Sequence, residues 1–151
     1  MDIVRLLQLM AEDHNLIYHY GKKAALNLLE GSANAGETYL LHEFTNRKSE
    51  YNNSGTRIMA HQYTGKFFLV KQSDFDQQYF AERDTAQAGK YATNIEPLLT
   101  VFETLGNRLA AKDYTVSQWE NIDVTDALDA NMDGLLCSYS VTIPVKYDIN
   151  Q

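Results

Sequence analysis

The sequence predicts an α+β fold in which helices pack on one face of a largely antiparallel or mixed β-sheet that carries a long polar β-hairpin loop. Two patterns carry this prediction. Apolar and polar residues alternate from Leu135 to Tyr147, which is the period of a half-buried strand. From Ile95 to Leu109 the apolar residues instead recur at helical spacing. No repeat or linker interrupts the chain, so we expect residues 1–151 to form a single domain.

The composition is that of an ordinary soluble globular protein. Of the 151 residues, 44% are hydrophobic and 22% are charged, and a chain of this length buries a core without a disulfide or a structural metal. Its formal net charge of −7 argues against a nucleic-acid-binding face, which needs clustered Lys and Arg. The sequence shows neither a signal peptide nor a membrane span, so we expect a protein made in a reducing cytoplasm.

The chain is expected to begin with an amphipathic helix. Residues 2–14 place apolar side chains at helical spacing, with Asp2 as the cap. A short strand from Leu16 to Tyr20 follows. Residues 22–30 are either helical or irregular, and the small residues at 31–36 are typical of a surface loop.

A polar stretch separates two predicted strands in the middle of the chain. Thr38 to Phe44 is apolar on both faces, and Thr56 to Gln72 reads as a central strand with a turn or bulge at Thr64–Lys66. Thr45 to Gly55 has almost no hydrophobic content, which predicts a protruding loop or hairpin tip. Such a loop is either a solvated connector or a segment that contacts another molecule.

The second half of the chain predicts helices followed by strands. Ser73–Asp76 resembles a helix start, and Thr93–Glu96 forms a second capping-box pattern just before Pro97. Thr115 to Val124 predicts a strand. Pro144 cannot donate a hydrogen bond to a neighbouring strand, so the last strand either lies at an edge near its end or bulges there.

An acidic turn precedes the last strand. Asp129, Asn131, Asp133 and Gly134 match the opening of an EF-hand calcium loop. The Glu that such a loop requires at its end is replaced by Ser140, and a strand follows in place of a helix. We therefore interpret the segment as a tight turn in which the glycine has a positive φ. A small ligand- or calcium-binding module that uses this turn is the alternative.

Other chemical motifs are missing from the sequence. It contains no nucleophile elbow and no phosphate-binding glycine loop. Cys137 lies on the apolar face of a predicted strand, as a small buried hydrophobe does. The histidines do not have the spacing of metal ligands; they are His14, His19, His42 and His61. We therefore predict no enzymatic activity, no cofactor and no metal.

Tyrosine is the most informative residue type. Ten tyrosines occur in the chain, and six of them lie between Tyr18 and Tyr79. Because tyrosine combines a large contact area with a hydroxyl that tolerates water, it is enriched at protein interfaces. Positions in the core or at its boundary are the alternative. The residues predicted to form a subunit interface are Arg47, Lys48, Tyr51, Asn52, Tyr63, Tyr79 and Lys146.

The order and lengths of these elements resemble those of the tail terminator and tail-completion proteins at the head-to-tail junction of tailed bacteriophages. The similar features are the first helix, the polar loop, the strand Gly-Lys-Phe-Phe-Leu-Val-Lys from Gly65 to Lys71, the long helix, and the acidic turn before the final strand. The resemblance extends over most of the chain and rests on order and length.

The resemblance implies a non-enzymatic structural virion protein, assembled in the host cytoplasm. It implies a homohexameric ring that joins the tail tube to the connector or neck, with no membrane contact. DNA would pass through without specific binding, because an acidic ring repels phosphates. Thr45 to Gly55 would reach toward the tube or the connector. A closed ring uses heterologous interfaces, so each subunit needs two complementary patches.

Overall fold

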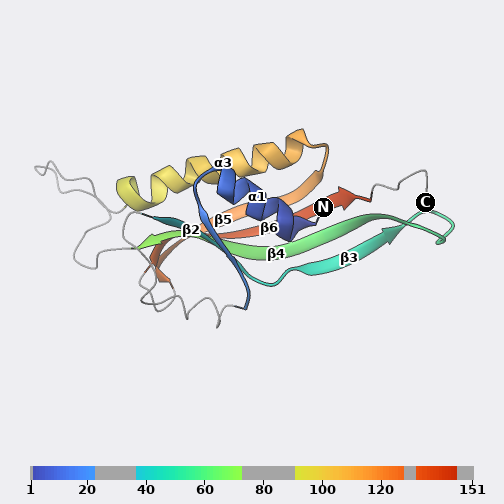
Figure 1. The fold of residues 1–151 in the computed structure, drawn as a ribbon, viewed down its shortest axis with the longest axis horizontal. Coiled ribbons are helices and arrows are strands. Elements are labelled where there is room, and N and C mark those ends of the chain that lie inside the picture. The colour runs from blue at the N-terminus through green and yellow to red at the C-terminus, as the bar shows by residue number, and fades with distance from the viewer. Residues whose placement is uncertain (1, 23–36, 73–90, 128–131, 146–151) are drawn as a thin grey trace, which may run out of the picture.

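The computed structural model describes residues 2–22, 37–72, 91–127 and 132–145, and it confirms the predicted α+β fold. Within these ranges, two α-helices lie on one face of a six-stranded sheet (Figure 1). In chain order the elements are α1 (Ile3–Asp13), β1 (Ile17–Tyr20), β2 (Thr38–His42), β3 (Asn46–Tyr51), β4 (Ile58–Gln72), a π-helical turn (Tyr91–Ile95), α3 (Glu96–Ala111), β5 (Thr115–Ala127) and β6 (Met132–Pro144).

The sheet is mixed, with one parallel pair. Its strand order is β1-β2-β4-β6-β5, and β3 also pairs with β4. Only β1 and β2 run parallel among the described strands, and the other neighbours are antiparallel. β2 and β3 occupy the same edge of β4, where β2 pairs with residues 67–71 and β3 with residues 58–64. The two long strands β4 and β6 therefore form the centre of the sheet.

The first helix forms as the sequence predicts. The carboxylate of Asp2 accepts a hydrogen bond from the backbone N–H of Arg5 at 2.9 Å, which caps the helix. Its apolar stripe faces the sheet, with Ile3, Leu7 and Met10 nearly or fully buried. The short strand predicted next is confirmed as β1.

The long helix is confirmed, but its predicted start is wrong. A π-helical turn, Tyr91–Ile95, leads directly into α3, and Ile95 at the cap position has helical dihedral angles. Ile95 makes no side-chain capping hydrogen bond. The pattern Thr93–Glu96 therefore lies within continuous helical backbone instead of marking the start of a helix. Pro97 lies in the first turn, where its missing N–H costs nothing.

The main core lies between the helices and the sheet. It combines the inner faces of α1 and α3 with alternate residues of the central strands. Among its fully buried side chains are Leu7, Leu40, Phe67, Leu69, Leu105, Leu135, Cys137 and Tyr139. The opposite face of the sheet carries a smaller apolar cluster of Tyr39, Leu41, Phe68, Val70 and Met132. This second cluster agrees with the prediction that the strand from Thr38 is covered on both sides.

The predicted polar loop is mostly a strand. Asn46–Tyr51 forms β3, all of whose side chains are exposed, and only residues 52–57 connect it to β4. The polar composition is misleading because β3 has no apolar layer on either face. A hairpin is nevertheless present, as the predicted fold requires.

The turn or bulge predicted at Thr64–Lys66 is wrong. β4 pairs with β6 without interruption through these residues. The irregularity lies on the neighbouring chain segment, because three residues lie between His42 and Asn46 whereas two lie between their partners Phe67 and Thr64. The chain therefore bends between β2 and β3 while β4 continues.

The predicted acidic turn is wrong at its last two positions. Asp133 and Gly134 belong to β6, opposite Lys71 and Val70 of β4. Gly134 has the predicted positive φ, at 159°, but it lies within a strand. A Cβ atom at this position would lie 2.0 Å from the carbonyl oxygen of Leu69, so the glycine permits a close approach of two strands and does not form a turn. Asp129 and Asn131 lie outside the described residues.

The alternation in the last strand is confirmed. The predicted inward residues Leu135, Cys137, Tyr139, Val141 and Ile143 are all buried. Val145, also predicted to point inward, is half-buried and lies beyond the end of the strand. The strand ends at Pro144, which pairs with Ala60 of β4. β5 pairs with β6 only as far as Thr142, so the proline has no strand neighbour on that side. The prediction that the strand lies at an edge near its end is therefore confirmed. The predictions for residues 23–36, for Ser73–Asp76 and for Tyr147 lie outside the described part of the chain.

Candidate functional site

The hairpin of β3 and the first half of β4 is the most prominent surface feature. We call β3, residues 52–57 and residues 58–64 of β4 the hairpin arm. The arm extends beyond the ends of both helices (Figure 1). Five of the seven predicted interface residues lie in it: Arg47, Lys48, Tyr51, Asn52 and Tyr63. The other two, Tyr79 and Lys146, lie outside the described residues.

The tip of the arm is held by its own hydrogen bonds. The side-chain oxygen of Asn52 accepts from the backbone N–H of Thr56 at 3.0 Å. The backbone N–H of Asn52 donates to the carbonyl of Arg57 at 2.9 Å. Gly55 supplies the positive φ of 68° that the turn requires. Asn52, predicted as a contact residue, therefore has its side chain engaged in shaping the tip.

The outer edge of the arm is open. Within the described residues β3 pairs with β4 alone, so the backbone groups on its other edge have no strand partner there. Tyr51 is 59% exposed, and Met59 on the opposite strand is 46% exposed. An unpaired strand edge with exposed apolar side chains is a typical site for pairing with another chain.

A buried histidine near the start of the arm links three strands of the sheet through its hydrogen bonds. The ring of His42, at the end of β2, is fully buried. Its Nδ1 lies 2.7 Å from the hydroxyl of Tyr18 on β1, and its Nε2 lies 2.6 Å from the hydroxyl of Tyr139 on β6. A neutral imidazole has one N–H and one acceptor nitrogen, so both hydroxyls are satisfied in either tautomer. The triad links three strands.

The protonation states of this triad follow from its burial. Desolvation lowers the pKa of His42 to about 4, so the imidazole is neutral at pH 7. Desolvation also raises the pKa of Tyr139 to about 12 and the pKa of Tyr18 above its ordinary value. All three groups are neutral at pH 7, and both ring nitrogens have partners. The triad is therefore arranged to position strands, and its ring nitrogens are already engaged.

Gly65 makes room for the triad. It lies opposite Tyr139, and a Cβ atom at this position would lie 2.6 Å from the tyrosine hydroxyl oxygen. The phenol passes over the glycine to reach the histidine. The sequence marks this residue only as a break in an apolar strand, and its partner becomes evident only from the register of β4 and β6.

Arg47 packs against Tyr63, another residue of the arm. Its guanidinium carbon lies 5.9 Å from the centre of the Tyr63 ring, a cation–π distance. Tyr63 is only 5% exposed. This tyrosine, predicted as an interface residue, therefore supports the exposed arginine above it.

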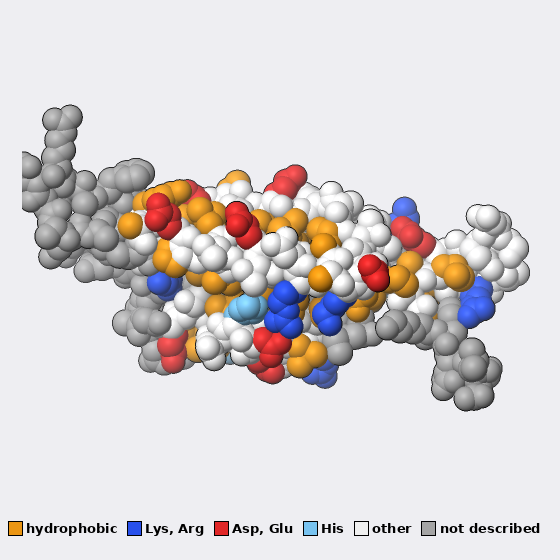
Figure 2. All heavy atoms as spheres, turned by 90° about the horizontal axis from the view of Figure 1, so that it is seen from above, with side chains coloured by type: hydrophobic (Ala, Val, Ile, Leu, Met, Phe, Trp, Pro, Cys, Tyr) orange, Lys and Arg blue, Asp and Glu red, His pale blue; other side chains and the backbone are white. Residues whose placement is uncertain are grey.

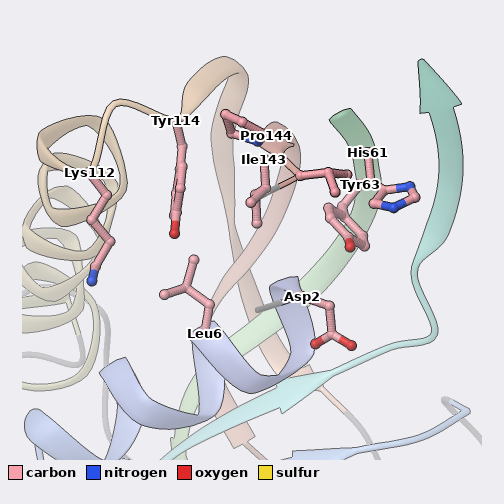
Figure 3. A pocket seen from close by; sticks show the side chains of 9 residues that line it. Asp2, Leu6, His61, Tyr63, Lys112, Tyr114, Ile143 and Pro144 are labelled. Carbon is pink, nitrogen blue, oxygen red and sulfur yellow. The ribbon is translucent and has the colours of Figure 1, made fainter. Parts of the chain in front are cut away.

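A pocket lies at the base of the arm, where the helices stop covering the sheet. Figure 3 shows its side chains converging from the first turn of α1, the end of α3, β4 and the end of β6. Its volume is about 490 Å³. Leu6, Tyr63 and Ile143 line it and are each at most 5% exposed, while Asp2 and Lys112 add charged groups.

The chemistry of the described surface is mixed. On the helix-bearing face, acidic, basic and hydrophobic side chains are interspersed (Figure 2).

Among the described residues no group of three or more His, Cys, Asp or Glu side chains is placed to hold a metal ion. Burial raises the pKa of the Cys137 thiol, which keeps it protonated. Of the helices in the described ranges, none is long and apolar enough to cross a membrane.

Comparison of the chain with protein-family models, with curated proteins and with solved structures finds no match. Sequence reasoning located most of the arm, because its polar composition departs from that of the neighbouring strands. It missed the triad, since a single histidine inside an apolar strand gives no sign of which hydroxyls will reach it.

Proposed function

We propose that the protein is a structural virion protein of a tailed bacteriophage, and that it forms a homohexameric ring at the head-to-tail junction. It would act there as a tail terminator or tail-completion protein that joins the tail tube to the connector. The observation that carries this proposal is the hairpin arm, which extends beyond the helix layer with an open edge and exposed side chains. The order of the elements, which resembles that of the head-to-tail junction proteins, supports it.

A ring subunit needs two different surfaces that fit each other. The arm supplies one surface that can reach a neighbouring molecule. Its base is rigid, because the triad joins β1, β2 and β6 at the point where β3 begins. An arm anchored in this way presents its side chains in a fixed direction, which lowers the entropic cost of association.

The overall charge fits a channel for DNA. A formal net charge of −7 on each subunit gives a hexamer a strongly negative field. Such a field repels phosphates and keeps a passing duplex from binding. No basic cluster is needed for this function.

The experiment that tests the proposal is a mass measurement by light scattering after size-exclusion chromatography. A hexamer has six times the subunit mass of 17.2 kDa, which is about 103 kDa. We expect this species in the wild-type protein at micromolar concentration, and ring-shaped particles in electron micrographs. A 17.2 kDa monomer at every concentration, in the presence and absence of salt, would refute the proposal.

A matched pair of variants tests the role of the arm. Met59 on the arm and Leu9 on α1 are both 46% exposed. We expect Met59→Ala to shift the mass distribution toward the monomer, and the additional change Tyr51→Ala to shift it further. Leu9→Ala removes an equally exposed side chain from the helix layer and should leave assembly unchanged. Equal effects of the two changes would show that the arm has no special role.

A further inference from the structure

We infer that neighbouring copies of this chain associate edge to edge, with the basic outer edge of β3 in one copy beside the acidic outer edge of β5 in the next. This inference rests on the proposed ring and identifies the contact that closes it. The partner is a second copy of the chain.

The two edges lie on opposite sides of the sheet. In the described part of the chain, β3 pairs only with β4, and β5 pairs only with β6. Because β4 and β6 are the central pair, the open edges of β3 and β5 point away from each other. A sheet with two open edges of this kind can continue from copy to copy, and a cyclic arrangement then closes it.

The charges of the two edges are opposite. Residues 46–64 contain three basic residues, Arg47, Lys48 and Arg57, against the single acid Glu50. β5 contains no Lys or Arg and three acids, Glu120, Asp123 and Asp126. β3 itself carries two basic residues and one acid, so the two edge strands differ in the sign of their net charge. Opposite charges on two patches of one chain favour head-to-tail association over association of like patches.

The relevant side chains are available. Arg47, Lys48, Glu120 and Asp123 are exposed, and none of the four forms an ion pair within the described residues. Ile122, between the two acids of β5, is 62% exposed. Association would bring this side chain beside the neighbouring strand and give each charge a partner.

The strand directions make the new contact antiparallel. β3 runs opposite to β4, β4 opposite to β6, and β6 opposite to β5, so β3 and β5 run in opposite directions within one subunit. A ring keeps all subunits in the same orientation relative to its axis. The β3 strand of one copy therefore meets the β5 strand of the next in the antiparallel sense.

The faces of the two strands also match. Lys48 pairs with Gln62, and Glu120 with Ser138, on the sheet face away from the helices. Arg47 and Asp123 lie on the helix-bearing face, as their partners on the central strands do. A register with Lys48 opposite Glu120 places Arg47 diagonal to Asp123, a separation of about 7–8 Å that a long side chain spans. Each face then receives one pair of opposite charges.

Charge reversal tests this contact. Lys48→Glu alone and Glu120→Lys alone each place like charges at every interface, and we expect the protein concentration for half-assembly to rise about tenfold in each case. An equimolar mixture of the two variants should assemble as the wild type does, because alternating copies restore an opposite pair at each contact. A ring with an even number of subunits can alternate without a mismatch. Light scattering gives the mass in each sample.

The control is Lys66→Glu, which reverses an exposed charge on the central strand β4, away from both edges. This variant should assemble as the wild type does, and circular dichroism should show that all variants fold. If the wild type forms a ring and the mixture does not recover, or if all three variants assemble normally, the edge contact is wrong while the ring stands. If the wild type is a monomer, the ring itself is refuted.

Discussion

The central strand β4 passes through two environments that differ in what lies above the sheet. Residues 67–70 are buried on both faces, whereas residues 58–62 in the hairpin arm are half-buried or exposed. Pairing with β6 is continuous through both parts, from Ala60 to Gln72. The difference is therefore one of side-chain burial, and it separates the part that stabilises the fold from the part that is free to contact other molecules.

The helix layer causes this difference. α1 and α3 cover the sheet over β2, the second half of β4 and the adjoining parts of β6 and β5, and beyond Tyr63 the arm extends past their ends (Figure 1). Trp119 of β5 shows how closely the covered part packs: its ring stacks on Phe102 of α3, with centroids 5.0 Å apart, and its indole N–H donates to the Phe102 carbonyl at 3.0 Å. The arm has no comparable layer.

The largest expected effect compares two apolar residues of β4. Leu69→Ala removes a fully buried side chain from the covered part, and we expect the free energy of unfolding to fall by about 2–5 kcal/mol. Met59→Ala in the arm should change it by less than about 0.5 kcal/mol, because the side chain is 46% exposed. Urea denaturation at low protein concentration measures both. Similar losses would mean that the arm contributes to the folded core.

The buried triad makes the covered part sensitive to acid. The unfolded chain protonates His42 near pH 6.5, whereas the folded protein does so only near pH 4. Between these values the unfolded state binds more protons, so stability falls as the pH is lowered from about 6.5 to about 4, by up to about 3 kcal/mol. Above pH 7, His42 should have no effect on the pH dependence of the free energy of unfolding.

The variant His42→Gln isolates this effect, because an amide retains a donor and an acceptor but does not titrate. Urea midpoints measured from pH 4 to pH 7 should fall less steeply in the variant than in the wild type. Parallel curves would show that other groups cause the acid sensitivity and that folding does not lower the pKa of His42.

A smaller effect is expected where α3 meets β5. A Cβ atom on Gly106 would lie 2.5 Å from the indole nitrogen of Trp119, so Gly106→Ala should destabilise the protein by about 1–3 kcal/mol through overpacking. In a Trp119→Leu background the same change should become neutral or stabilising, since alanine favours a helix over glycine by about 1 kcal/mol. Thermal denaturation of the four proteins measures this cycle. A loss that persists without the indole would contradict the proposed contact.

The sequence was informative where periodicity and burial agree. The apolar stripe of α1, the stripe of α3 and the alternation in β6 each have one face that must leave water, so the pattern identifies the element. Composition was misleading for β3, because a strand with solvent on both faces has no apolar signature. It was also misleading at Asp133 and Gly134, where a motif typical of turns lies inside a strand that a neighbouring backbone approaches closely.

By itself, the sequence determined the class of the fold, the positions of the main helices and strands and the excess of negative charge, because these depend on local periodicity and composition. Only the tertiary structure decided which strands are neighbours. Pairing between residues far apart in sequence brings Tyr18, His42 and Tyr139 into one hydrogen-bonded triad, leaves β3 and β5 as opposite edges, and ends the helix layer before the arm. These features arise from long-range packing, which no short stretch of sequence encodes.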